Sequence, residues 1–324
     1  MKKNNLQLLL ISFLVVLFTS CEDESNNIII IDNGNPSEEE TGGNEDGDAV
    51  DTTATDVVRN WDLFQPYSCY EDLSANSFNI VTWNIEWFPK RAGSTISRLA
   101  DLINSTNADV IAMQEVAEPD QLATLVAALP GWNYKVYDVR GDQELGYLYK
   151  ESEIASISEL SIIYPNNTSA FYRPPVIVEV EHINGQKITL FNIHLKCCGG
   201  SQNVARRKEA SELLKDYIDN NLANEKVIVL GDFNDEITGS DNPFENFVAD
   251  SAKYYFADTE IATGNYQYWS YPGFGQFGSH IDHVLISNEL FDDVTAISTL
   301  AYDECISSYD YYVSDHRPLI ISID

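Results

Sequence analysis

Nine short apolar segments constrain the fold of this chain more than any other feature of its sequence. Each is five to seven residues long, and several are apolar throughout rather than alternating, which is typical of strands buried on both faces. They lie at 78–84, 109–114, 134–139, 145–150, 176–182, 188–194, 227–231, 281–287 and 318–323. Amphipathic stretches at 94–105, 119–129 and 203–222 read as helices. Without any internal repeat, this alternation predicts one α/β domain with two central sheets flanked by helices.

The N-terminal segment 1–20 has the composition of a targeting signal. Lys2 and Lys3 precede an apolar run over 8–18 that is too short for a membrane span, which needs ~20 apolar residues. Small residues before Cys21 resemble a bacterial lipobox, which predicts a signal peptide over 1–20 and a lipidated Cys21. The alternative is an ordinary cleaved signal followed by an unrelated cysteine.

The next segment, 21–60, is expected to be a solvated tether. Twelve acidic residues and no basic residue lie between Glu22 and Asp56, so the segment cannot bury enough apolar surface to offset its ordering entropy. The folded domain is therefore expected over 61–324. A lipid on Cys21 would anchor that domain to the cell envelope, at the outer membrane, in the periplasm or on the surface.

The folded domain is strongly acidic. The whole chain carries a net charge of −32, of which the signal contributes two lysines and the tether twelve carboxylates, so about −22 remains on the domain. This charge repels nucleic acid at long range and is compatible with a site that holds a cation.

Four further cysteines leave the disulfide pattern open. Cys69, Cys197, Cys198 and Cys305 allow two disulfides in three connectivities in an oxidising compartment. A bond between the adjacent Cys197 and Cys198 is strained, so each is expected to pair elsewhere or to remain a thiol. The Cys-x-x-Cys spacing typical of zinc sites does not occur in the sequence.

Several of the predicted strands run directly into polar residues, where a fold places catalytic groups at a rim. The carboxylates of Glu115, Asp232 and Asp315 are hard ligands of the kind that Mg²⁺, Mn²⁺ or Ca²⁺ prefers. The amides of Asn84 and Asn234 can orient a water molecule or a phosphate oxygen. Next to Asp315, His316 can protonate or hydrogen-bond a phosphoryl oxygen, and the Asp282 carboxylate can hold its ring. Together these groups suit metal-assisted attack of water on phosphorus.

Six short motifs in a fixed order resemble the endonuclease/exonuclease/phosphatase superfamily. They are TWNIE (82–86), MQEV (113–116), NIHL (192–195), GDFND (231–235), IDHVL (281–285) and SDHRP (314–318). The similarity spans about 78–324. It implies a four-layer α/β sandwich, with two mixed sheets between helices and the active site at their shared edge, and metal-dependent hydrolysis of phosphoesters.

The resemblance also implies roles for the residues around the metal and the attacking water. Glu115 would bind Mg²⁺, with Mn²⁺ or Ca²⁺ as alternatives, and Asn84 and Asp315 would lie beside it. Asp232 would activate or align the water, and Asn234 would orient the water or the phosphate.

Other residues of the motifs would contact the substrate. His316, held by Asp282, would contact the scissile phosphate. His194 resembles the second histidine of the deoxyribonuclease branch, with Glu144 as the candidate for its carboxylate partner. Arg173 resembles a phosphate-contacting arginine of that branch. The alternative for Glu144 and Arg173 is an ordinary surface charge, and an isolated Asn or Asp after a strand is usually a turn former or helix cap.

The leading functional hypothesis is a secreted, lipid-anchored, nuclease-like phosphodiesterase. The runner-up is a phosphatase or phosphodiesterase acting on inositol phosphates or lipid headgroups, and a non-catalytic binding module comes third. The expected partners are a phosphoester substrate and, through the lipid, a membrane; no obligate protein partner is indicated. Two further expectations are that His182 is exposed beside a hairpin turn and that the aromatic residues of 254–277 are mostly core.

Overall fold

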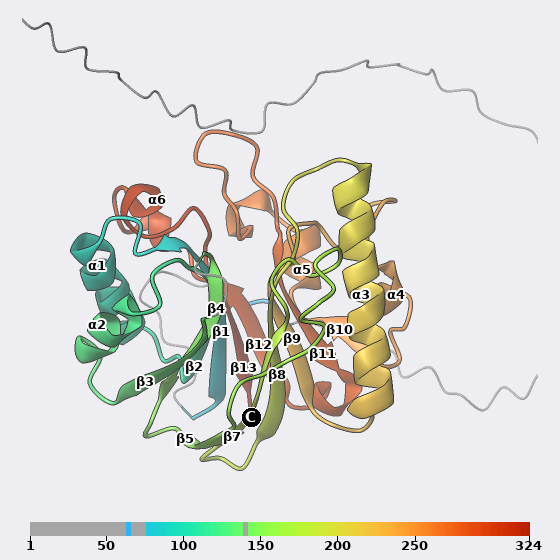
Figure 1. The fold of residues 1–324 in the computed structure, drawn as a ribbon, viewed down its shortest axis with the longest axis horizontal. Helices are drawn as coiled ribbons and strands as arrows, with labels where there is room; N and C mark the ends of the chain where they lie inside the picture. The colour runs from blue at the N-terminus through green and yellow to red at the C-terminus, as the bar shows by residue number, and fades with distance from the viewer. Residues whose placement is uncertain (1–62, 66–75, 139–141) are drawn as a thin grey trace, which may run out of the picture. The chain divides into compact units, whose positions relative to one another are not determined.

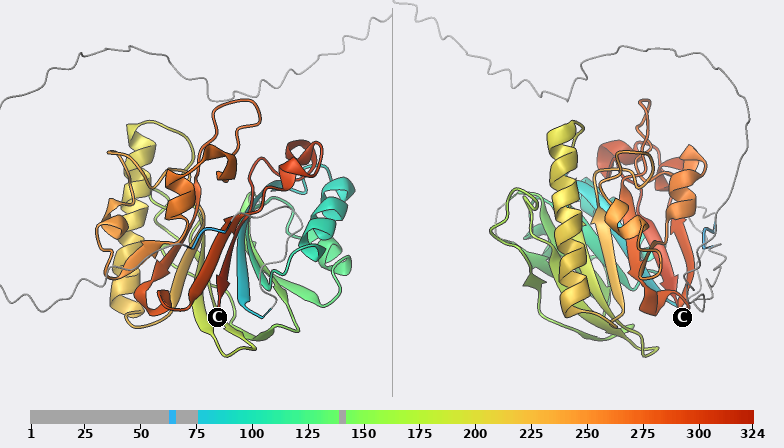
Figure 2. Two further views of the ribbon diagram at one scale, coloured as in Figure 1. Left: turned by 180° about the vertical axis from the view of Figure 1, so that it is seen from behind. Right: turned by 90° about the vertical axis from the view of Figure 1, so that its right-hand side faces the viewer.

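The computed structural model describes residues 63–65, 76–138 and 142–324. The predicted signal peptide, Cys21, the acidic tether and Cys69 lie outside the described residues. Figures 1 and 2 show two sheets packed face to face, with α1 and α2 on the outer side of one sheet and α3 and α4 on the outer side of the other. This is the predicted four-layer α/β sandwich, and the predicted fold class is confirmed.

The first sheet has six strands in the order β12-β13-β1-β2-β4-β3. The central strand β1 runs parallel to β2 and antiparallel to β13, so the sheet is mixed, as expected. The strand bounds are β1 Phe78–Phe88, β2 Val110–Val116, β3 Trp132–Tyr137, β4 Glu144–Lys150, β12 Val294–Thr299 and β13 Leu319–Ile323.

The second sheet has seven strands, in the order β10-β11-β9-β8-β7-β5 with β6 paired to β7. It is mixed as well, because β8 runs parallel to β9 while β9 runs antiparallel to β11. The strand bounds are β5 Ile154–Ile157, β6 Ser161–Ile162, β7 Val176–His182, β8 Lys187–His194, β9 Val227–Asp232, β10 Tyr254–Phe256 and β11 Asp282–Ser287.

The first three helices agree with the predicted stretches to within a few residues, whereas the three short later ones were not predicted. They are α1 Gly93–Asn104, α2 Gln121–Ala127, α3 Ser201–Asn221, α4 Glu245–Val248, α5 Thr259–Thr263 and α6 Tyr309–Tyr312, with 3-10 turns η1 Tyr266–Tyr268, η2 Asn288–Leu290 and η3 Tyr302–Glu304. Among the described residues, no helix combines the length and the apolar composition that crossing a membrane requires.

Three apolar clusters hold the layers together, and the two faces of a central strand pack into different clusters. Along β1, Phe78 and Ile80 pack between the two sheets, while Val81 and Trp83 pack under α1 and α2. A third cluster lies between the second sheet and α3, where Leu214 contributes from the helix. Strands buried on both faces account for the runs that are apolar throughout.

The strands place their polar ends at one edge. In the parallel pair β1–β2, Asn84 lies opposite Gln114, and Glu115 follows. In the parallel pair β8–β9, His194 lies opposite Asp232, and the antiparallel β11 begins with Asp282 opposite Asp232. Parallel neighbours end on the same side, so residues far apart in the sequence meet there.

Four strands were not predicted from the sequence: β5, β6, β10 and β12. The first three are two to four residues long, below the length at which an apolar pattern stands out from a loop. Strand β12, with the sequence VTAIST, has few large apolar residues, and it forms a strand because it pairs with β13.

One side-chain expectation was wrong, and a second holds for only part of its segment. His182 is buried, not exposed, because it lies on the inner face of β7, stacked on Phe78 with ring centroids 4.6 Å apart. The aromatic stretch divides: Tyr254 and Phe256 are buried, whereas Tyr266, Phe274 and Phe277 belong to the exposed large apolar residues. The exposed three follow the last strand of that stretch, where no sheet covers them.

The cysteines of the described residues differ in state. Cys305 is disulfide-bonded, whereas Cys197 and Cys198 are thiols with their Sγ atoms 3.0 Å apart. Both thiols lie between β8 and α3, next to the edge where the polar residues gather.

Candidate active site

The side chain of Asn84 links the carboxylates from the two sheets. Its Nδ2 donates to Glu115 Oε1 at 3.1 Å and to Asp232 Oδ2 at 2.9 Å. Its Oδ1 accepts from the backbone N–H of Glu86 at 3.0 Å. Asn84 therefore presents its amide nitrogen to the carboxylates in this structure, and its oxygen is turned to the backbone. Glu115 also accepts from the backbone N–H of Trp87 at 3.1 Å.

The backbone has an unusual conformation at Glu115 and at Asn234, which comes two residues after Asp232. Glu115 has a φ of 62° and Asn234 a φ of 55°, which are left-handed values uncommon outside glycine. The N–H of Asn234 donates to Asp232 Oδ1 at 2.9 Å, so this turn fixes the carboxylate that precedes it. Such local strain tends to occur where the surrounding structure positions functional groups.

Glycine at 231 is required by the packing of β9 against β8. Its φ is 143°, and a Cβ there would lie 2.0 Å from the backbone oxygen of Ile193. The close approach of the two strands sets Asp232 opposite His194. The close contact between β8 and β9 thus explains why the GDFND motif begins with glycine.

His316 is held by Asp282, as the sequence predicted for the pair. The ring Nδ1 lies 2.7 Å from Asp282 Oδ2, and Nε2 lies 3.9 Å from Asp232 Oδ2. Burial by itself lowers the pKa of His316, but the Asp282 carboxylate outweighs it and raises the pKa well above its usual value. His316 is therefore an imidazolium at neutral pH, with Nδ1–H donated to Asp282 and Nε2–H facing the site.

His194 lies on the other side of the same carboxylates. Its Nε2 is 3.5 Å from Asp232 Oδ2 and 3.9 Å from Glu115 Oε1. Burial, and after it the positive charge of Arg173, lowers the pKa of His194 well below its usual value, so the ring is neutral. The predicted hydrogen bond to Glu144 is not formed here, because His194 Nδ1 is buried without a hydrogen-bond partner.

Two carboxyl groups of this region hold their protons unusually tightly. Burial, followed by the charge of Asp282, raises the pKa of Asp232 to about 7. Burial, followed by the charge of Asp315, raises the pKa of Glu86 to about 7. Glu86 Oε2 accepts from the backbone N–H of Asp315 at 2.8 Å, so Asp315 joins the site through Glu86.

The residues of this edge fit a hard divalent cation. Carboxylates from several strands are crowded together, their negative charges oppose one another, and Asp282 Oδ1 is buried without a hydrogen-bond partner. A carboxylate oxygen of Asp232 lies within 4.8 Å of one from Asp282, whereas His316, protonated on both ring nitrogens, offers no lone pair to a metal. Oxygen donors that repel one another are the set that Mg²⁺, Mn²⁺ or Ca²⁺ neutralises. The donor chemistry thus agrees with the predicted class of metal without selecting one ion.

Most of the predicted residues line one pocket of about 450 Å³. From the predicted set it contains Glu115, Arg173, His194, Asp232, Asn234 and His316, with Gln143, Tyr172, Lys196, Cys197 and Arg206 beside them. Asn84 and Asp282 lie behind its wall, in contact with Asp232 and His316 respectively. Asp315 lines an adjacent pocket of about 340 Å³ with Glu86 and Tyr271.

Two supporting groups were missed by the sequence analysis. Between the sheets, Gln114 Nε2 donates to Asn192 Oδ1 at 2.8 Å, which ties β2 to β8. Buried Arg207 donates to Asp235 and to the backbone oxygens of Lys196 and Cys198. The two amides lie within the MQEV and NIHL motifs and could have been suspected, but nothing in the pattern of α3 indicates that Arg207 points inward.

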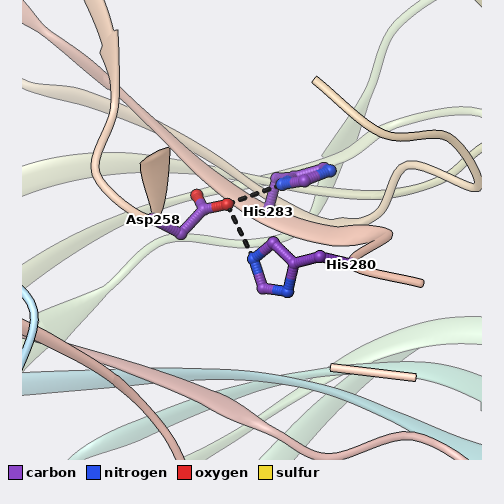
Figure 3. Close-up of side chains that lie close together, drawn as sticks. All are labelled: Asp258, His280 and His283. Carbon is purple, nitrogen blue, oxygen red and sulfur yellow. Dashed lines mark hydrogen bonds and ion pairs between the residues drawn. The ribbon is translucent and has the colours of Figure 1, made fainter. Parts of the chain in front are cut away.

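A buried cluster is formed by Asp258, His280 and His283, and both histidines contact the same Asp258 oxygen (Figure 3). His283 belongs to β11 and also contacts the Asp235 backbone oxygen, which connects the cluster to the site. His280 Nδ1 accepts from the backbone N–H of Ser270, so its Nε2 carries the proton and donates to Asp258 at 3.0 Å. His283 faces acceptors at both nitrogens, Asp258 Oδ2 at 2.6 Å and the Asp235 oxygen at 3.0 Å, and is therefore protonated. With its lone pairs used, this cluster is a hydrogen-bonded brace and not a metal site.

Solved structures share this fold at low sequence identity. Humanized D. rerio TDP2 has a TM-score of 0.61 and 16% identity, covering 78% of this chain and 100% of that one. A Bacteroides thetaiotaomicron mannosyl-6-phosphatase has a TM-score of 0.58 and 18% identity, covering 76% and 100%. The human Nocturnin catalytic domain with bound sulfate has a TM-score of 0.58 and 18% identity, covering 78% and 95%. No curated protein sequence matches the chain.

The sequence itself matches the Endonuclease/Exonuclease/phosphatase family over residues 81–316. The matched range includes all of the strand ends described above, from Asn84 to His316. Since the match extends over most of the chain, the protein belongs to the Endonuclease/Exonuclease/phosphatase family and is a hydrolase of ester bonds.

Proposed function

We propose that this protein is a metal-dependent phosphoesterase whose reaction takes place in the pocket between Glu115 and His316. The observation that carries the proposal is the convergence of Glu115, His194, Asp232 and His316 on that one pocket, although they come from β2, β8, β9 and the turn before β13. Carboxylates, a charged imidazolium and a neutral imidazole in one cleft supply the groups that phosphoester hydrolysis requires.

Asp232 is proposed to orient and deprotonate the attacking water. Its carboxylate is held by Asn84 Nδ2 on one oxygen and by the Asn234 N–H on the other. A pKa raised to about 7 makes it a stronger base than an ordinary carboxylate while it is still ionised at slightly alkaline pH. Asn234, whose Nδ2 donates to the Leu195 oxygen, would help to position the water or the phosphate.

His316 and His194 are proposed to bind the phosphoryl group from two sides. The Nε2–H of His316 faces the pocket and can donate to a phosphoryl oxygen, because Asp282 keeps the ring charged and oriented. His194 stays neutral, and Arg173 in the same pocket can offer a guanidinium to a phosphate oxygen.

A divalent ion, for which Mg²⁺ is the first choice, would be held by Glu115 with Asp315 nearby and Asn84 behind. When bound, it supplies Lewis-acid polarisation of the phosphoryl oxygens and neutralises developing charge. Burial is the first cause of the raised pKa values of Glu86 and Asp232, and the neighbouring charges of Asp315 and Asp282 are the second; a bound cation would offset these charges.

The leading substrate candidate is a nucleotide-type phosphodiester. D. rerio TDP2, which shares the fold, has been solved in complex with a single-strand DNA product, and this gives the candidate support at the level of the fold. A second candidate is a small phosphorylated compound. It is favoured by the pocket of about 450 Å³ and by a domain charge near −22, which repels long polyanions. The mannosyl-6-phosphatase with the same fold is one such enzyme.

We further propose that the protein is secreted and anchored in the cell envelope by a lipid on Cys21. The support is the sequence of residues 1–21 and the acidic segment that follows. Metabolic labelling with a fatty-acid analogue tests this point: the label should enter the wild type and be lost in Cys21→Ser. Equal labelling of both proteins would refute the anchor.

The function is tested with a panel of phosphoesters, each assayed with Mg²⁺ and with a chelator. Plasmid DNA, bis(p-nitrophenyl) phosphate, sphingomyelin, inositol polyphosphates and sugar phosphates cover the candidate classes. We expect chelator-sensitive turnover of at least one class. If only small phosphoesters react, the nuclease candidate fails. If none of the panel reacts in the presence of Mg²⁺, the proposed phosphoesterase activity fails.

A further inference from the structure

The active-site pocket contains three basic side chains, although the protein as a whole is acidic. Arg173, Lys196 and Arg206 line it together with the carboxylates of Glu115 and Asp232. The chain contains 19 Lys and Arg against 51 Asp and Glu, so three basic side chains in one cavity are unexpected from composition alone.

These three side chains have no carboxylate within ion-pair distance among the described residues. Elsewhere in that part of the chain, most basic side chains are paired: Lys90, Lys135, Lys150, Lys187, Arg207, Lys215, Lys226, Lys253 and Arg317. Lys196 has only the Cys197 thiol, 3.3 Å from its Nζ. What distinguishes the pocket is that three unpaired basic side chains share one cavity, in a protein where carboxylates are abundant.

Neutral backbone oxygens hold the two arginines in place. Arg173 Nε donates to the Gln143 oxygen at 2.7 Å, and Arg206 Nη2 donates to the Thr168 oxygen at 2.9 Å. Carbonyl groups fix the direction of a guanidinium without cancelling its charge. The backbone of Lys196 is held where its oxygen accepts from buried Arg207. The two guanidinium groups are therefore oriented before any ligand enters, and Lys196 extends from an anchored backbone position.

The function proposed above uses only one of these charges. Arg173 would contact the reacting phosphate together with His194 and His316. Lys196 and Arg206 then have no role in a reaction on a single phosphate. Two open positive charges in a half-enclosed cavity attract an anion, and charge-assisted hydrogen bonds to phosphate are among the strong ones.

We propose that Lys196 and Arg206 form a second anion subsite, which binds a further phosphate of a small organic phosphoester while its first phosphate reacts at Asp232 and His316. This inference rests on the proposed function. The pocket volume of about 450 Å³ suits a substrate of sugar-bisphosphate size. The acidic surface of the domain disfavours a long polyanion in the same position.

The experiment is steady-state kinetics on matched substrates that differ by one phosphate. The pairs are fructose 1,6-bisphosphate with fructose 6-phosphate, and the dinucleotide pTpT with TpT; bis(p-nitrophenyl) phosphate reports the chemistry without a second anion. For the wild type we expect a KM at least about tenfold lower for the doubly phosphorylated member of the sugar pair. A preference confined to the dinucleotide pair would assign the subsite to nucleic acid and overturn the proposal of a small substrate.

Variants connect that preference to the two residues. Lys196→Gln and Arg206→Gln should each raise KM for the bisphosphate at least about tenfold and change kcat/KM for bis(p-nitrophenyl) phosphate less than twofold. Arg206→Lys, which keeps the charge, should recover part of the loss. Lys208→Gln is the matched control, because Lys208 is exposed on the same helix and lines a different pocket.

The outcomes separate the two proposals. Equal losses on singly and doubly phosphorylated substrates, or no preference in the wild type, would overturn the second subsite and leave the phosphoesterase standing. The absence of chelator-sensitive turnover on every substrate would overturn both. Melting temperatures of the variants within a few degrees of the wild type, measured alongside, exclude misfolding as the cause of a raised KM.

Discussion

At the scale of single residues, the site depends on the environment that each ionisable group receives. Asp232 and His316 are both buried, yet one becomes a carboxyl with a raised pKa and the other a retained imidazolium. Asp282 contributes to both shifts: its negative charge opposes ionisation of Asp232 and favours protonation of His316. Asp282 thereby raises the pKa of both neighbours, of which Asp232 is proposed to act as a base and His316 as a charged hydrogen-bond donor.

Removing the reactive groups should lower turnover without unfolding the protein. We expect Asp232→Asn and His316→Gln each to reduce kcat by at least about 100-fold on any substrate that the wild type hydrolyses, because each removes a proton-transfer or hydrogen-bonding group from the reaction. His182→Gln is the comparison: this buried histidine lies away from the site against Phe78. It should lower the melting temperature and keep kcat. Unchanged turnover in Asp232→Asn would remove that residue from the mechanism.

The role of Asp282 predicts a specific change in pH dependence. In the wild type, kcat should fall as the pH drops through about 7, because Asp232 takes up a proton there. In Asp282→Asn, the lost negative charge lowers the pKa of Asp232, so the fall of kcat on the acidic side moves to lower pH. His316 loses its partner as well, and its own pKa falls. The fall of kcat on the alkaline side, where His316 loses its proton, therefore also moves to lower pH. A pH–rate profile checks both shifts, and a profile that stays in place would contradict the assignment.

At the scale of secondary-structure elements, the close contact between β8 and β9 positions His194 and Asp232. Gly231→Ala should break it, because a Cβ at this position would lie 2.0 Å from the Ile193 oxygen. We expect a loss of at least about 2 kcal/mol of unfolding free energy, together with a loss of activity. Gly93→Ala, where a Cβ meets nothing within 4 Å, is the matched control in urea unfolding. Equal stability of both variants would show that the strands can separate without cost.

The cluster of Asp258, His280 and His283, the last of which belongs to β11, predicts how the stability of the protein depends on pH. Burial lowers the pKa of His283, but Asp258 outweighs this effect and the net pKa is raised above its unfolded value. The stability that His283 contributes is therefore complete below about pH 6.5 and is lost as the pH rises through the raised folded-state value. His283→Phe suits the surrounding rings of Phe233 and Phe256 but leaves Asp258 without its charged donor.

We expect His283→Phe to cost about 3 kcal/mol near pH 6 and less near pH 9, because the wild type loses the same contribution on deprotonation. Urea unfolding of both proteins from pH 5.5 to 9 measures the difference. A gap that stays constant or widens toward pH 9 would mean that His283 is not charged in the folded protein.

The elements that carry the site could be predicted from the sequence, whereas some that support it could not. The strands of the site were predicted, because each is buried on both faces and ends in a polar motif that stands out from an apolar run. Strand β12 was not, since its pattern is weak and pairing with β13 defines it. The Asp258 cluster was not predicted either, because two histidines and an aspartate 22 to 25 residues apart meet only through the tertiary fold.

At the scale of the whole molecule, the folded unit is expected to be independent of the segment before it. One compact unit spans Asn60–Asp324, close to the boundary expected from composition. A protein that begins at Asn60 should keep the kcat and melting temperature of the full chain while losing any association with membranes. A drop of more than a few degrees in melting temperature would assign part of the fold to the preceding segment.

Because the domain is acidic, binding of a divalent cation should raise its free energy of unfolding. A domain with a net charge near −22 is destabilised by repulsion between its own carboxylates, and any salt relieves part of it by screening. A divalent ion bound at Glu115 and Asp315 would add a specific contribution, about 2.7 kcal/mol at 100 times its dissociation constant. The two effects separate when MgCl₂ is compared with NaCl at equal ionic strength.

We therefore expect MgCl₂ to raise the melting temperature of the wild type by several degrees more than NaCl does, and the excess to vanish in a Glu115→Gln, Asp315→Asn double variant. Because the carboxylates must be ionised to bind the ion, the excess should also shrink as the pH falls below 7, where Glu86 and Asp232 become protonated. Identical melting curves in the two salts at pH 8 would mean that these carboxylates do not bind the ion. The phosphoesterase would then need a metal site elsewhere in the chain.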